Sequence, residues 1–215
     1  MSSHLRLVGD VHGNIASYIS LVKEIPYSIQ LGDLGFKYKP WIYDLSADQH
    51  KVLAGNHDNY DLEDGIFVNQ TEHFLGDYGV HTVPDIGNLF FIRGGNSIDR
   101  YNRIAGLSWW PDEELSYEKC QKALDLYSKL KPDMVISHEC PESVIKYVSG
   151  LNHWNGKPIP PSVTSMVLQY MFEKHQPKLW FFGHHHKSWT MMIDGTQFRC
   201  LNELEVYDIP KGGLL

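Results

Sequence analysis

Five short apolar runs place the strongest constraint on the fold of this chain, because residues with acid, amide or imidazole side chains follow closely after each run. The runs span residues 5–8, 28–31, 51–54, 134–137 and 179–182. Glycine follows four of the five runs, and glycine permits the tight turns that aim such side chains. Where parallel strands end at one edge of a sheet, their loops share a crevice in which ligands bind. The pattern therefore predicts an α/β fold with a polar site at the carboxyl ends of its strands.

The segments between these runs indicate helices and hairpins. Apolar spacing predicts four helices, over residues 15–25 after Asn14, 116–130, 141–148 and 162–175. Turn signals at 84–87 and at Asp194-Gly195 predict two hairpins, while residues 151–161 carry three prolines and are expected to form a loop. No repeat or linker divides the sequence, so we expect residues 1–215 to form one α/β domain with sheets packed between helices.

Composition excludes several classes of protein. The chain has 19 Lys and Arg against 26 Asp and Glu, a net charge of −7. This balance argues against broad binding to duplex DNA or to an anionic membrane. No apolar run approaches the roughly 20 residues of a membrane span, and no secretion signal is evident. The three cysteines lack metal-binding spacing, and we expect a cytoplasmic location, where thiols stay reduced.

Seven side chains at the ends of the runs form a candidate metal-ligand set. They are Asp10, His12, Asp33, Asn56, His138, His184 and His186. A single tetrahedral zinc site cannot use so many ligands, whereas two divalent metals that share a carboxylate can. The high proportion of imidazole favours Mn, Fe, Zn or Ni over Ca or Mg. His185, between two candidate ligands, is expected to point the other way on a strand and not to be a ligand.

Five motifs in order resemble those of the calcineurin-like metallophosphoesterase superfamily. They are GDVHG (9–13), GDLG (32–35), GNHD (55–58), SHECP (137–141) and GHHH (183–186). The resemblance covers about residues 5 to 200 and implies a four-layer αββα sandwich, with two mixed sheets flanked by helices. It also implies hydrolysis of a phosphoester, by in-line attack of a metal-bound hydroxide on phosphorus without a covalent intermediate.

The resemblance also assigns roles to the candidate ligands. One metal would be held by Asp10, His12, Asp33 and His186, and the other by Asp33, Asn56, His138 and His184. Asp33 would bridge the two ions, for which we expect Mn, with Fe, Zn or Ni as alternatives. His57 matches the family histidine that contacts the phosphate and protonates the leaving oxygen, a task that suits a histidine.

The sequence departs from the Ser/Thr protein phosphatases of this superfamily. Phe36 stands where that branch has the aspartate that orients the catalytic histidine, and Ala54 stands where it has an arginine. The partner of His57 is therefore open between Asp58 and a backbone carbonyl. Arg93 is a candidate phosphate clamp, with an ion pair to a carboxylate such as Asp99 as the alternative.

Nearby residues leave further alternatives open. Arg100 and Arg103 are expected to have surface or structural roles. Trp109 and Trp110 either form a lid that stacks on a base or anchor their loop to the core. Cys140 is expected to be a small buried filler.

The substrate and the function both keep alternatives. We expect a small phosphomonoester or phosphodiester, with a nucleotide among the candidates, and the oligomeric state stays open. One alternative is a metal-binding scaffold on the same fold without turnover. Another, within the enzyme reading, is a protein phosphatase of the Ser/Thr type.

Overall fold

The computed structural model describes residues 4–35, 44–60, 72–148, 153–154, 157–158 and 162–212, so Phe36 lies outside the described residues. One sheet has four strands in the order β12-β1-β2-β3. They are β1 (His4–Val8), β2 (Tyr27–Gln30), β3 (His50–Val52) and β12 (Val206–Pro210). The first three run parallel, and β12 is antiparallel to β1. Three of the predicted apolar runs therefore end at the same edge of this sheet.

The second sheet has six strands in the order β10-β11-β9-β6-β5-β4. They are β4 (Tyr78–Val83), β5 (Gly87–Ile92), β6 (Met134–Ser137), β9 (Leu179–Phe182), β10 (Trp189–Ile193) and β11 (Thr196–Cys200). The four central strands are parallel, and β4 and β10 are antiparallel at the two edges. Both edge strands belong to the two predicted hairpins. A separate two-stranded pair joins β7 (His153–Trp154) to β8 (Lys157–Pro158), within the segment expected to be a loop.

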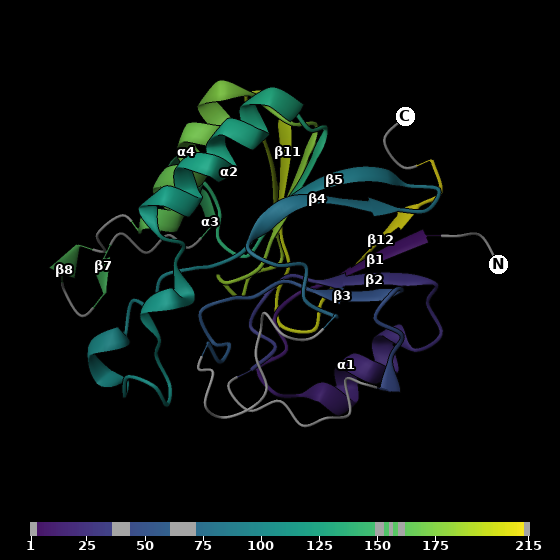
Figure 1. Ribbon diagram of the computed structural model, residues 1–215, viewed down its shortest axis with the longest axis horizontal. Helices are drawn as coiled ribbons and strands as arrows, with labels where there is room; N and C mark the ends of the chain where they lie inside the picture. Colours follow the sequence, from purple (N-terminus) through teal and green to yellow (C-terminus); the bar gives the residue numbers. More distant parts are fainter. Residues whose placement is uncertain are drawn as a thin grey trace.

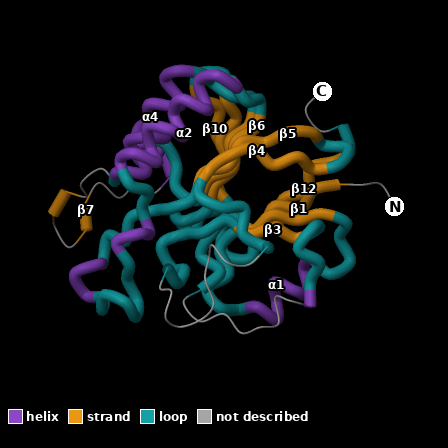
Figure 2. The backbone as a smooth tube through the Cα atoms, viewed as in Figure 1, coloured by secondary structure: helices purple, strands orange, loops and turns teal. Residues whose placement is uncertain are grey.

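Helices cover the outer faces of the two sheets. They are α1 (Ile15–Val22), α2 (Tyr117–Leu130), α3 (Glu142–Val148) and α4 (Val163–Lys174). Figure 1 shows α2, α3 and α4 together on one side of the molecule and α1 on the other. In Figure 2 the orange strands lie between these two groups of helices. This arrangement confirms the expected α/β fold, with two mixed sheets flanked by helices.

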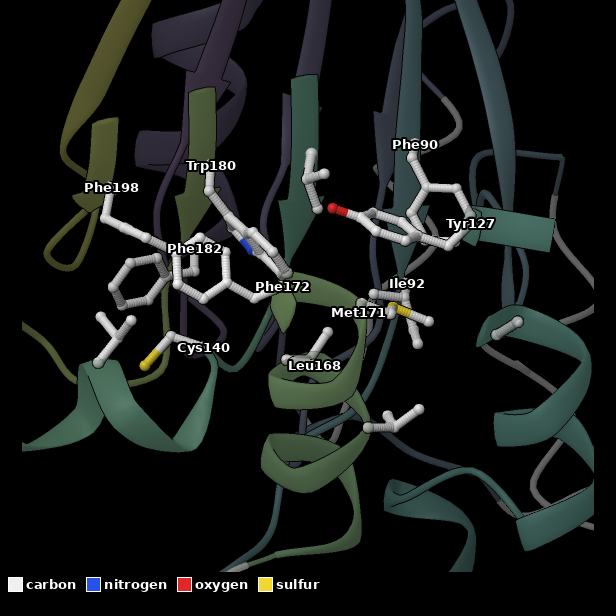
Figure 3. Packing of buried hydrophobic residues seen from close by; sticks show 14 of the residues in the cluster. Phe90, Ile92, Tyr127, Cys140, Leu168, Met171, Phe172, Trp180, Phe182 and Phe198 are labelled. Atoms are coloured by element: carbon white, nitrogen blue, oxygen red, sulfur yellow. The ribbon is translucent and has the colours of Figure 1, made fainter. Parts of the chain in front are cut away.

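Three apolar clusters fill the spaces between the layers. One packs α2, α3 and α4 against the second sheet, one fills the space between the sheets, and one packs α1 against the first sheet. Trp180 is fully buried in the first of these clusters, among the side chains of Figure 3. Its ring stacks on Phe198 with 5.5 Å between centroids, and its Nε1 donates to Ser137 Oγ at 2.8 Å. One side chain thus joins β9, β11 and β6.

The structure corrects two details of the sequence analysis. The first helix ends at Val22 rather than at residue 25, and Asn14 makes no side-chain capping hydrogen bond. Strand β12 was not expected, because within the described residues it pairs with β1 alone, some 200 residues earlier in the chain (His4 pairs with Pro210). Pairing at that separation leaves no local signal. In the described part of the chain, no helix has the length and apolar character needed to cross a membrane.

Replacing Trp180 with alanine is expected to lower the free energy of unfolding by about 3–5 kcal/mol, the usual cost of removing a buried aromatic ring. Met192→Ala serves as the control, because Met192 is 63% exposed and should change stability by less than about 0.5 kcal/mol. Urea unfolding followed by circular dichroism measures both values. Equal midpoints for the two variants would contradict the assigned packing.

Candidate metal centre

The loops after five parallel strands bring the seven predicted ligand residues together. Two groups of side chains that could hold a metal ion form there, Asp10, His12, Asp33 and His186 in the first, and Asp33, His138 and His184 in the second. Asn56 joins the second group, since its Oδ1 lies 3.0 Å from His138 Nε2 and 2.9 Å from His184 Nδ1. Each group takes residues from loops of both sheets, so the site lies where the carboxyl ends of the two sheets meet.

The first group surrounds a carboxylate oxygen to which the described residues donate no hydrogen bond. Asp33 Oδ2 is buried and unpaired among the described residues, and His12 Nε2 lies 3.8 Å from it. His12 Nε2 and His186 Nε2 face each other at 2.9 Å, and Asp10 Oδ2 lies 3.1 Å from His186 Nε2. Leaving a buried polar atom unsatisfied is costly. A divalent cation among these donors would satisfy them together, so the residues fit a metal ion.

The second group directs imidazole nitrogens inward. His138 Nδ1 donates to the Leu31 carbonyl oxygen at 2.9 Å, which leaves Nε2 directed at Asp33 Oδ1, 3.2 Å away. His184 Nε2 lies 3.2 Å from Glu139 Oε2, which leaves Nδ1 for the centre. Such outer contacts fix the tautomer of metal-binding histidines. Asp33 therefore directs one carboxylate oxygen to each group, an arrangement that suits a bridging ligand.

The backbone at the site is strained toward this geometry. Four of the predicted ligand residues have left-handed φ values, between 47° and 65°: His12, Asp33, His184 and His186. Residues with side chains avoid this region unless their surroundings impose it. At Gly183 a Cβ would lie 2.2 Å from Asp10 Oδ1, so only glycine fits there. His184, His185 and His186 lie in a loop after β9, and this turn, not the strand alternation we expected, directs His185 away from the two groups.

His57 lies beside both groups and contacts an arginine. Its backbone N–H donates to Asp33 Oδ1 at 2.7 Å, and Arg103 donates to its Nε2 at 2.7 Å. Because a guanidinium has no acceptor, the Nε2 atom accepts here and the imidazole is neutral. Burial lowers the pKa of His57 to about 4; Asp33 opposes this shift and Arg103 adds to it.

Asp58 holds the loops that carry the ligands. Its buried carboxylate accepts hydrogen bonds from three backbone N–H groups, those of Asp33, Gly35 and Gly55, at 2.7–3.0 Å. Burial raises the pKa of Asp58 to about 7, and the charge of Asp33 adds to the rise. This carboxylate therefore joins the loops after β2 and β3, and a role for it in orienting the His57 ring stays a prediction.

The structure does not bring Arg93 to the site. Its side chain is almost fully buried, donates to Asp77 Oδ1 at 2.6 Å and to the Asp112 carbonyl oxygen at 2.7 Å, and lies over the ring of Tyr60. The ion pair that we expected as the alternative is present, but with Asp77 instead of Asp99. A guanidinium enclosed in this way has no free face for a phosphate.

A cavity of about 510 Å³ opens over the two groups, a volume typical of small-molecule sites. Its lining includes Asp33, Asn56 and His57, the cationic side chains of Arg103 and Lys187, and the apolar side chains of Ile98 and Ile145. Trp109 and Trp110 are not among the lining residues. Trp110 is buried against Ala54 and Tyr60, which supports the anchoring alternative.

Two residues of the site escaped the sequence analysis. Arg103 was expected to be structural, yet it lines the cavity and contacts His57; no local signal separates it from Arg93 and Arg100. Glu139 is buried against the predicted ligand His184, and its place inside the SHECP motif was the signal that could have found it.

Comparisons with known proteins agree with this geometry. The family profile described as calcineurin-like phosphoesterase matches residues 4–188. The chain belongs to the calcineurin-like phosphoesterase family. A search of curated proteins gave no significant match.

Solved structures show the same fold at low sequence identity. The phosphopantetheinyl hydrolase of Mycobacterium tuberculosis superposes with a TM-score of 0.52 at 16% identity, over 94% of this chain and 91% of that one. A putative 5'-nucleotidase from Staphylococcus aureus superposes with a TM-score of 0.51 at 13% identity, over 95% of this chain and 50% of that one. The chain thus spans about half the length of the second protein. At such identities these likenesses concern the fold alone.

Asp58→Asn is expected to lower the free energy of unfolding by about 1–3 kcal/mol, because an amide nitrogen would replace an oxygen that accepts backbone N–H groups. Asp48→Asn is the matched control, since Asp48 is exposed. Thermal unfolding of the metal-free protein measures both. An unchanged midpoint for Asp58→Asn would show that the carboxylate does not hold the loops.

Arg93→Ala is expected to lower the free energy of unfolding by about 3 kcal/mol, because it leaves a partly buried Asp77 without its main partner. If Arg93 instead clamped a phosphate, the variant would keep its stability and raise KM. Denaturant unfolding and steady-state kinetics on the same preparation separate these two outcomes.

Proposed function

We propose that this protein is a metal-dependent phosphoesterase that hydrolyses a small phosphomonoester or phosphodiester in the cavity above Asp33. The observation that carries the proposal is the Asp33 carboxylate, buried between two groups of donors with one oxygen directed at each. The alternative of a scaffold without turnover is disfavoured, because the chain keeps every expected ligand residue and His57.

The donor sets support an assignment of the metal-binding residues. Asp10, His12, Asp33 and His186 would hold one divalent ion, and Asp33, Asn56, His138 and His184 the other. When bound, two such ions polarise phosphoryl oxygens and activate water for in-line attack. The mixed carboxylate and imidazole donors admit several first-row divalent ions; of these we propose Mn²⁺, with Fe, Zn or Ni as alternatives.

His57 and Arg103 would act on the substrate together. In the free protein the Nε2 atom of His57 accepts from Arg103, so this atom has no proton to give. A phosphate oxygen that drew Arg103 away would form a charge-assisted hydrogen bond with the guanidinium. It would also free Nε2 to take up a proton and deliver it to the leaving oxygen. We therefore propose Arg103, in place of Arg93, as the phosphate contact.

The cavity sets the size of the substrate. Its volume of about 510 Å³ accommodates a nucleotide-sized molecule, and Ile98 and Ile145 offer apolar surface to a leaving group. Within the family, nucleotides and other small phosphoesters are therefore the substrates we propose. We also propose that residues 1–215 form one domain. We propose the cytoplasm as the location of the protein, because all three cysteines are free and buried.

Metal-free protein is expected to hydrolyse para-nitrophenyl phosphate or its bis-para-nitrophenyl diester only after Mn²⁺, Ni²⁺, Zn²⁺ or Mg²⁺ is added. His57→Ala should lower kcat by about 10²–10⁴-fold, the usual contribution of a general acid. Arg103→Ala should lower kcat/KM by about 10–100-fold through the lost charge-assisted hydrogen bonds.

Arg100→Ala is the matched control, because Arg100 is exposed and lies outside the cavity lining, and it should behave as the wild type. The ratio of the two rates assigns the monoester or diester preference. A protein that binds two equivalents of metal but hydrolyses neither compound with any of them would be the scaffold instead.

A further inference from the structure

The loops that supply the predicted histidine ligands also carry three donors that the metal centre does not use. Glu139 and Cys140 follow His138, and His185 lies between His184 and His186. Their ligand atoms lie within 4.8 Å of one another. Glu139 Oε1 is 2.7 Å from His185 Nε2, and Cys140 Sγ is 3.5 Å from the same nitrogen. A carboxylate, a thiol and an imidazole thus converge behind His184.

Burial holds these donors in place. Cys140 is fully buried and Glu139 is 4% exposed. Figure 3 shows Cys140 in the apolar cluster that packs α2, α3 and α4 against the second sheet. Glu139 and His185 also line the cavity described above. The core therefore encloses the cluster at Cys140, while Glu139 and His185 face the cavity.

The donor types select a particular class of metal. A thiolate and a carboxylate carry two negative charges, which match a divalent cation and remove the penalty for its burial. Three protein ligands of the Cys, His and Glu types with one open position are typical of zinc. Sulfur disfavours Mg²⁺ and Mn²⁺, so this cluster differs in preference from the oxygen and nitrogen donors of the two groups around Asp33.

We propose that Glu139, Cys140 and His185 form a third metal site, which binds one thiophilic divalent cation such as Zn²⁺. On binding, the Cys140 thiol releases its proton to solvent. The His185 proton moves through solvent from Nε2, which donates to Glu139 in the free protein, to Nδ1, so that the Nε2 lone pair can face the ion. Glu139 then joins two centres, since its other oxygen contacts Nε2 of the ligand His184.

Cobalt tests the site directly, because only a thiolate ligand gives Co²⁺ a sulfur-to-metal charge-transfer band. Metal-free full-length protein is first loaded with two equivalents of Mn²⁺ and then titrated with Co²⁺. The wild type should develop the near-ultraviolet band and saturate at one cobalt-thiolate centre per chain. Zinc-loaded protein should retain three ions per chain after gel filtration, as counted by mass spectrometry of the metal.

Cys140→Ser should abolish the band and reduce the zinc count from three to two. Cys120→Ser is the matched control, because Cys120 is also a buried free cysteine but lies in α2, and it should keep both signals. His185→Gln should weaken the third ion by about 100-fold or more, since even the loss of an outer partner of a ligand costs 10–100-fold in affinity.

Absence of the band in the wild type, or its persistence in Cys140→Ser, overturns the proposal and leaves the cluster as a hydrogen-bonded one. If Cys140→Ser does not fold, the cobalt titration of His185→Gln tests the proposal instead, because the His185 side chain lines the cavity. In a parallel titration without Mn²⁺, the visible cobalt bands of the nitrogen and oxygen donors report the centre around Asp33 separately. Loss of those bands or of hydrolysis with the charge-transfer band retained would refute the proposed function and leave the third site standing.

Discussion

A buried carboxylate, that of Asp33, is the constraint on which the site depends. Burial raises the pKa of Asp33, but the charge and hydrogen bond of His138 more than offset this effect. They hold the pKa of Asp33 well below its usual range. The ionised group needs positive charge or N–H donors on every side. The His57 backbone N–H and His138 Nε2 both contact Oδ1 of Asp33, while the second oxygen lacks any hydrogen-bond partner among the described residues. The position of this one group explains why two sheets, and not one, contribute loops.

The features that the sequence predicted correctly are those that neighbouring residues in the chain determine. Short apolar runs, glycines and turn signals determine where β1, β2, β3, β6 and β9 end, and the ligands follow those ends directly in sequence. The order of five motifs then identified the family and, through it, the layers. These features needed no knowledge of distant contacts.

The arginines show where local reasoning stops. Arg93 and Arg103 lie ten residues apart with similar neighbours, yet one is enclosed by Asp77 and Tyr60 and the other reaches His57. The path of the chain between them depends on Glu113, whose buried carboxylate accepts hydrogen bonds from the backbone and hydroxyl of Ser97. Glu113 follows Ser97 by 16 residues, and its sequence context resembles that of an ordinary acidic helix start. Strand β12 was missed for the same reason, since its partner lies at the other end of the chain.

The division of the ligands between two sheets has a consequence for folding. Asp10, His12, Asp33 and Asn56 follow strands of one sheet, whereas His138, His184 and His186 follow strands of the other. An ion held by either group would link the two sheets at the edge of the apolar layer between them. Ligand binding that requires the native arrangement adds its free energy to that of folding. The cellular supply of metal would then set how long this molecule survives as a folded chain, as well as how fast it works.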